Sequence, residues 1–394
     1  MALCWAASIC AVAASQTGQT PVFRSGVELV AIDVQVVDRD GRPTVSLVAD
    51  QFDVSIDGRR RKVLSADLVR YAQSPAGRLR QTLTPALTPD GAPADRVFIL
   101  AVDQLSFRPA AARVAAQAAR QFLNRLQADD VVGVYFYPGS QRLDLTHERA
   151  SVRGSLDRIV GLLDVPYSEF KLTISEVTDI TAGDPDVLNR VVRRECMVPD
   201  NICAARIQGE AFSIGSMYEM QITQSFIGLR RLVRGLAHMP GRKTLVLLSG
   251  GLLASDRGGG RPDMKTQTVE LGQEVAAANA NLYVLHLDNY FLDAFSAESR
   301  GPNMTTLFRD KTALGEGLDL LAGAAGGALF RVEAGMPDSA FDRVLRETSA
   351  YYLLGVEVAD ADRDGHPHFI HVKVNQQGTT VRNRPLVVIP RNKS

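Results

Sequence analysis

Polar residues that could bind a ligand stand directly after several apolar runs in the middle of the chain. Asp103 and Ser106 follow the first run, Ser249 follows the third, and Asp288 ends the fourth. A carboxylate in this position can hold a hard cation such as Mg²⁺ through its oxygens. It can also cap the helix expected to begin near Pro109 or accept hydrogen bonds from loop amides. Both roles stay open for Asp103. Candidate rim residues of a binding site are Ser106, Ser249 and Asp288.

The apolar runs themselves predict a parallel sheet. They are continuous rather than alternating, which is typical of strands buried on both faces. Helical patterns separate them, and this alternation predicts a doubly wound α/β fold whose ligands bind at the carboxyl ends of the strands. The expected strands are 97–102, 131–137, 244–248, 282–287 and 328–332, and the expected helices are 109–126, 204–238, 263–280 and 314–325.

Both ends of the folded chain show the alternation of half-buried strands. Residues 27–38 place Val34 and its apolar neighbours on one side and polar residues such as Gln35 on the other. Alternating strands recur at 352–358 and 370–374. Neither end has enough strands for a stable domain alone, so we expect the two ends to form one small antiparallel β-domain.

The first twenty residues predict export. Residues 3–14 are apolar and uncharged, too short to span a bilayer, and end in the A-x-A pattern Ala11-Val12-Ala13. No Lys or Arg precedes Arg24, so a frayed apolar terminus is the alternative interpretation. The predicted organisation is a signal peptide (1–20), an N-terminal β segment (24–73), a linker (74–94), an α/β domain (95–348) and a C-terminal β segment (349–394).

The charge balance argues against a dedicated nucleic-acid binder, and the cysteine usage fits a secreted or periplasmic protein. Lys+Arg and Asp+Glu both number 44, whereas dedicated nucleic-acid binders usually carry a basic surplus. No other apolar run in the sequence is long enough to span a membrane either. Cys196 and Cys203 flank a turn, which in an oxidising compartment favours a local disulfide, with two free thiols as the alternative.

A second acidic motif lies near the C-terminus. Asp360, Asp362 and Asp364 precede Gly365, as in the first half of a calcium loop, but His371 stands where the bidentate Glu of an EF-hand belongs. An acidic hairpin turn is the favoured interpretation, and calcium the alternative. The six histidines show no metal-ligand spacing on a helix, and we expect them on the surface.

The chain resembles the von Willebrand factor A-related family that is abundant in Acidobacteria. The resemblance covers about residues 25–390 and depends on the order of its marks rather than on any one of them. These marks are VDRDGRP, FDVSIDG, VFILAVDQLS, GRKTLVLLSGGL, SAYYLLGVEV and HFIHVKV. The resemblance implies a von Willebrand factor A fold for residues 95–348 with a small β-domain attached.

The resemblance also implies where a metal-ion-dependent adhesion site would lie. Its pattern is D-x-S-x-S after the first strand, a Thr on a later loop, and an Asp in a T-D-G turn. Asp103 matches the first acid. The two serine positions hold Leu105 and Phe107, and Ser106 is one position out of register. The position of the second Asp holds Gly250. The candidate threonines are Thr173, Thr178 and Thr181. We therefore expect a degenerate site, and neither Mg²⁺ nor Ca²⁺ is assigned as a cofactor.

Three classes of function remain. The favoured one is a non-catalytic extracytoplasmic module that binds a protein or a surface polymer through the loops at the top of the sheet. The second is a metal-dependent or hydrolytic enzyme that uses Asp103, Asp288 and an acid from a loop at Glu176 or Asp179. The third is a structural envelope component.

Overall fold

The computed structural model describes residues 29–71, 96–140, 142–239, 241–255, 257–288, 305–333 and 337–391. The predicted signal peptide (1–20) and linker (74–94) lie outside these residues. None of the described helices combines the length and the apolar character that crossing a bilayer requires.

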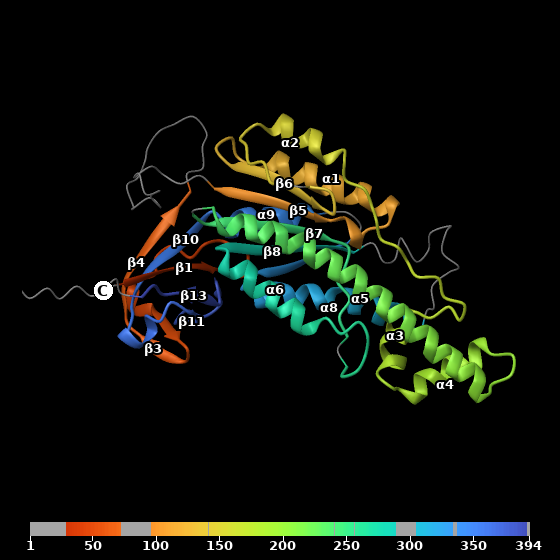
Figure 1. The fold of residues 1–394 in the computed structure, drawn as a ribbon. Coiled ribbons are helices and arrows are strands. Elements are labelled where there is room, and N and C mark those ends of the chain that lie inside the picture. Colours follow the sequence, from red (N-terminus) through yellow and green to blue (C-terminus); the bar gives the residue numbers. More distant parts are fainter. Residues whose placement is uncertain are drawn as a thin grey trace, which may run out of the picture.

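The core is a five-stranded, fully parallel sheet in the order β6-β5-β7-β8-β9 (Figure 1). Each strand coincides with one of the predicted apolar runs, and the fold class is confirmed. The chain leaves β5 toward β6 on one side and returns to β7 on the other, so the topological switch point lies between β5 and β7. The strands are β5 (Val97–Asp103), β6 (Val131–Tyr137), β7 (Lys243–Ser249), β8 (Ala280–Asp288) and β9 (Ala328–Glu333).

Helices cover both faces of this sheet, which explains why its strands are mostly apolar. One face packs on α1 (Pro109–Arg125), α2 (Arg149–Leu156) and α9 (Asp338–Glu347). The other packs on α5 (Asn201–Ala237), α6 (Lys265–Ala277) and α8 (Leu307–Ala324). α8 begins seven residues earlier than its apolar pattern predicts.

The two ends of the described chain form a β-sandwich, as predicted. One sheet has the order β12-β1-β10-β4 and the other β13-β11-β2-β3. Apolar side chains from both sheets form a separate core that includes Val34, Tyr352 and Val372. The strands are β1 (Leu29–Val37), β2 (Phe52–Ile56), β3 (Arg59–Arg61), β4 (Val63–Arg70), β10 (Ala350–Glu357), β11 (Pro367–Val374), β12 (Thr380–Asn383) and β13 (Leu386–Val388).

Polar contacts join the sandwich to the α/β core and correct one expectation. Gln35 is buried rather than solvent-facing: its amide donates to the Glu347 carbonyl (3.0 Å) and its oxygen accepts from the Tyr283 hydroxyl (3.1 Å). Arg382 donates to the buried Glu347 carboxylate (2.9 Å). The C-terminal half of β1 is therefore covered on both faces, because its polar side packs on the α/β core.

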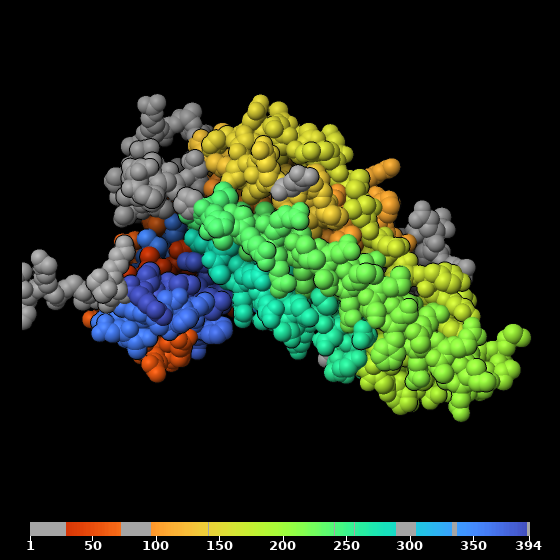
Figure 2. Space-filling view, viewed as in Figure 1, coloured from red at the N-terminus to blue at the C-terminus, as the bar shows by residue number. Residues whose placement is uncertain are grey.

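A helical protrusion extends from the far end of the α/β core, opposite the sandwich (Figures 1 and 2). It consists of α3 (Ile174–Thr181), α4 (Pro185–Glu195) and the N-terminal part of α5, with its own small apolar core. We expected Glu176 and Asp179 on a loop, but both lie on α3. The protrusion is inserted between β6 and β7.

Candidate functional site

Asp103 is the last residue of β5, at the switch point, and its carboxylate accepts hydrogen bonds from other groups of the protein. Its side chain is buried, and its Oδ1 accepts from the Leu105 amide (3.2 Å) and from the Ser225 hydroxyl on α5 (2.8 Å). Burial raises the pKa of the Asp103 carboxyl to about 7, although these hydrogen bonds act to lower it. Of the two roles left open by the sequence, the structure shows the capping role, since Asp103 caps the short turn Gln104–Ser106.

The position of the second adhesion-site acid has no room for a side chain. A Cβ at Gly250 would lie 2.3 Å from the Ser106 carbonyl oxygen and 3.1 Å from the buried Phe107 ring. The Ser106 hydroxyl donates to the Asp103 carbonyl (2.7 Å) and accepts from the Gly250 amide (2.8 Å). Ser106 therefore ties the end of β5 to the end of β7.

Residues 160–163, which we call the covering segment, are hydrogen-bonded along the turn that follows β5. The Leu162 amide donates to the Gln104 carbonyl (2.8 Å), and the Leu163 amide donates to the Phe107 carbonyl (2.9 Å). A Cβ at Gly161 would lie 2.2 Å from the Arg108 carbonyl oxygen, so only glycine permits this close approach. The switch point is thus filled from within by Phe107 and lined outside by the covering segment.

The other two predicted rim residues, Ser249 and Asp288, also form contacts within the protein. Ser249 is buried and its hydroxyl bonds to the backbone of Gly251, which corrects its assignment to an accessible rim. Asp288 forms an ion pair with Lys311 (2.9 Å). His286, next to the switch point, contacts the Gly250 carbonyl through Nε2 (3.1 Å), and burial lowers the pKa of its imidazole.

Apart from Asp103, the carboxylates that could have formed an enzymatic metal centre lie in separate ion pairs. Glu176 pairs with Arg194 (2.6 Å), whereas Asp179 pairs with Arg309 and Arg257 (3.2 Å to the latter). Within the described ranges, no group of three or more His, Cys, Asp or Glu side chains is arranged to hold a metal ion.

The acidic turn 360–365 is held by internal cations. Arg61 on β3 binds Asp362 through two hydrogen bonds (2.8 and 2.7 Å) and lowers the pKa of its carboxyl. Asp364 accepts from the His366 amide (2.7 Å) and contacts His368. A calcium ion would have to displace Arg61, so the structure favours the hairpin-turn interpretation.

Two histidines contradict the expected surface placement. His368 is buried between Asp57 (2.7 Å) and Asp364 (3.1 Å), and its hydrogen bond to Asp57 raises the pKa of its imidazole. His286 is buried as described above. The sequence misleads at His368 because its partner Asp57, in the β2–β3 turn, lies 311 residues away.

Cys196 and Cys203 form a disulfide, with Cα atoms 6.3 Å apart. The bond joins the end of α4 to the first turn of α5. It fixes the far end of the helical protrusion.

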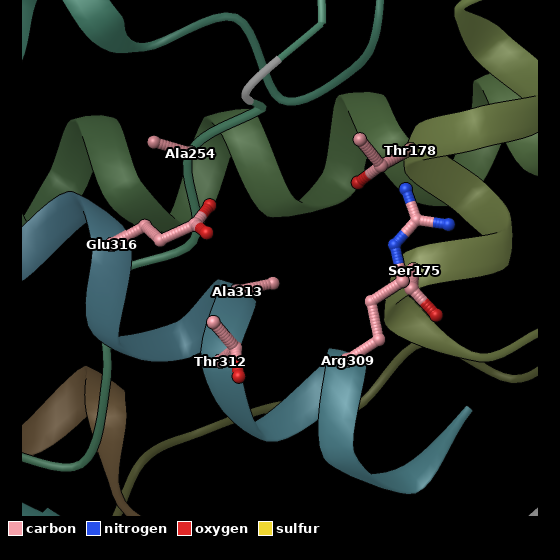
Figure 3. A pocket seen from close by; sticks show the side chains of 7 residues that line it. All are labelled: Ser175, Thr178, Ala254, Arg309, Thr312, Ala313 and Glu316. Carbon is pink, nitrogen blue, oxygen red and sulfur yellow. The ribbon is translucent and has the colours of Figure 1, made fainter.

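A small pocket lies between α3, α8 and the loop after β7 (Figure 3). Ser175 and Thr178 on α3 face Arg309, Thr312 and Glu316 on α8, with Ala254 and Ala313 completing the wall. Among the residues that the structure describes, the buried Ser175 hydroxyl has no hydrogen-bond partner. Sequence reasoning missed Ser175 and Arg309, because they lie far apart in the chain and neither belongs to a motif.

Comparisons with known proteins add little to this geometry. No family model matches the chain, and no curated protein matches it. Solved structures that match include the VWA domain of SpRpn10 (9% identity, 64% of this chain and 94% of that chain, TM-score 0.28). Another is the pilus adhesin SpaC of Lactobacillus rhamnosus GG in its open conformation (8% identity, 84% of this chain and 48% of that chain, TM-score 0.36). A third is the human COPII-coat protein Sec24c (9% identity, 76% of this chain and 44% of that chain, TM-score 0.26). This chain spans less than half of the last two proteins, and these TM-scores are too low to transfer a site or a function.

Proposed function

We propose that this protein is a non-catalytic extracytoplasmic module of the von Willebrand factor A type that binds a protein partner. The observation that carries the proposal is a division of the carboxyl edge of the parallel sheet. At the switch point, Asp103, Ser106 and Phe107 are bound or packed within the protein. Beside it, the pocket between α3 and α8 contains the buried Ser175 hydroxyl, which bonds to none of the described residues.

The size of this pocket favours a side chain as its occupant. Its volume is about 40 Å³, whereas pockets for cofactors and drug-sized ligands hold roughly 300–1,000 Å³. Ser175 can donate or accept a hydrogen bond, and Thr178 and Thr312 have acceptor lone pairs in addition to the bonds they donate. A polar side chain of a partner protein would fit both the volume and this chemistry.

The adhesion-type metal site is proposed to be degenerate. The acid expected at position 250 is a glycine without room for a side chain, and Phe107 packs where a serine ligand is expected. No part of the proposed recognition therefore depends on Mg²⁺ or Ca²⁺.

Export to the periplasm or the exterior belongs to the same proposal. The apolar residues 3–14 and the A-x-A pattern support it. So does the disulfide, because such bonds persist in oxidising compartments.

Site-specific photocrosslinking tests the proposed function. A photoreactive amino acid replaces Thr312, an exposed residue on the pocket wall, and a second variant carries it at Gln377, an exposed turn residue of the sandwich. In cells of the native producer, we expect a discrete adduct with one protein from position 312 and none from position 377. Equal labelling from both positions, or no adduct at either, would contradict a protein-binding role for the carboxyl edge.

A further inference from the structure

The far end of the helical protrusion exposes apolar side chains. We call residues 196–203 the tip. Met197 is fully exposed, and Ile202 and Val198 are about 73% and 67% exposed. Single exposed apolar residues are common on protein surfaces. Three within six positions form a local apolar surface, which is typical of an interaction site.

The tip is held rigidly in this exposed arrangement. The disulfide closes it, and the Asp200 carboxylate caps α5 by accepting from the Cys203 amide (2.8 Å). Beneath it, Val191 and Ile207 are fully buried. The exposed side chains therefore cannot fold back onto the protein, and an interaction here would cost little ordering entropy.

Positive charge lies beside this apolar surface. Arg190 and Arg193 are exposed on α4, and neither forms an ion pair with any part of the chain that the structure describes. The neighbouring Arg194 and Arg206 are already paired, with Glu176 and Glu169 respectively. A partner with carboxylates around an apolar surface would complement the two unpaired guanidinium groups.

We propose that the tip inserts into an acid-rimmed apolar groove on a partner protein, with Met197 and Ile202 as anchors and Arg190 and Arg193 contacting the rim. This inference rests on the proposed protein-binding function and names the chemistry of the partner. A rigid shape favours a protein groove over a lipid surface, because a bilayer requires no matching shape. The exposed Asp200 and the absence of aromatic residues from the tip also disfavour an anionic membrane.

Selection from a phage-displayed random peptide library tests the partner's chemistry. The library is panned on the disulfide-intact protein after depletion on the bare support only. We expect enriched peptides that combine Leu, Ile or Phe with flanking Asp or Glu. Their Kd should rise at least about tenfold in that variant and at least about threefold in Arg190→Gln/Arg193→Gln, and should rise with ionic strength.

Matched variants control for loss of exposed residues in general. Ile227→Ser removes an exposed apolar side chain from α5 outside the tip, and Arg234→Gln removes an exposed arginine from the same helix. Both should leave the Kd within about twofold. All changed side chains are exposed, and hydrogen exchange of α5 checks that each variant folds.

Three outcomes would overturn the inference. Enriched peptides without acidic residues, or binding that survives the Met197→Ser/Ile202→Ser change, would remove its basis. Binding to vesicles of 30% phosphatidylglycerol in phosphatidylethanolamine that depends on the same residues would assign the tip to a membrane. Self-association that depends on them would assign it to a second copy. The adduct at position 312 separates these outcomes from a failure of the proposed function itself.

Discussion

The two halves of the 37-residue helix α5 lie in different environments: one packs on the sheet, and the other belongs to the protrusion. In the C-terminal half, Leu229 and Leu236 pack on the sheet and Ser225 holds Asp103. The N-terminal half leaves the sheet and packs on α3 and α4, ending at the exposed tip. At the switch point, where doubly wound sheets usually bind ligands, the side chains of this protein stabilise the fold. The tip that we propose as a binding site lies instead at the far end of the inserted protrusion.

The largest expected effect comes from restoring an acid at the switch point. Gly250→Asp should destabilise the protein by at least about 3 kcal/mol, because the new Cβ would meet the Ser106 carbonyl at 2.3 Å. Denaturant unfolding measures the change. Gly258→Asp is the control, since no atom of the described residues lies within 4 Å of a Cβ there. A stable Gly250→Asp protein would show that the switch point can open.

Asp103 should make stability depend on pH. Its folded pKa of about 7 lies above the ordinary value of 3.8, so its carboxyl favours folding when protonated. Its contribution is largest below about pH 4, falls as pH rises toward 7 and is then constant, a change of up to about 4 kcal/mol.

Asp103→Asn should remove this part of the pH profile, because the amide oxygen can still accept from Ser225 and Leu105. We expect the variant to be more stable than wild type at pH 8 by about 2 kcal/mol, measured by denaturant unfolding across the pH range. Parallel profiles for the two proteins would show that Asp103 is charged in the folded state.

Removing the disulfide should loosen one half of α5 and spare the other. The short loop it closes predicts a stabilisation of about 2–3 kcal/mol. In Cys196→Ser/Cys203→Ser, hydrogen-exchange protection should fall in α4 and the N-terminal half of α5. Residues around Leu229 should keep theirs. An equal loss along the whole helix would show that the protrusion and the sheet unfold as one unit.

The smallest expected effect is a difference in pKa between the two buried histidines. NMR titration should place the pKa of His368 above 6.5 and that of His286 below it, and Asp57→Asn should lower the former. His368 therefore stabilises the sandwich below pH 6.5 and loses this effect as pH rises through its folded pKa. The contribution of His286 has the opposite sign, because it is lost as pH falls. The reverse order would contradict the assigned hydrogen bonds.

Much of the fold follows from sequence periodicity. Continuous apolar runs predicted all five core strands, since burial on both faces leaves no exposed position in β7, for example. Alternation predicted β1, β10 and β11 of the sandwich, because one face of β11, for example, is buried and the other exposed. The long apolar pattern likewise predicted α5.

The protrusion and the site were harder to predict. The T-x-x-E sequence from Thr173 to Glu176 and the Asp184-Pro185 pair are helix-start signals that would have identified α3 and α4. The pocket has no such signal, because its walls come from helices far apart in the chain. Packing at Gly250 is equally invisible in sequence, since it depends on the path of the turn after β5.

Metal-dependent unfolding tests the central claim most directly. The protein and its Asp103→Asn variant are unfolded with EDTA and with Mg²⁺, Mn²⁺ or Ca²⁺. An ion at roughly 100 times its Kd would add about 2.7 kcal/mol to the stability of the folded state. We predict no shift for either protein, because the switch point is filled. A Mg²⁺-dependent increase that Asp103→Asn abolishes would contradict the account.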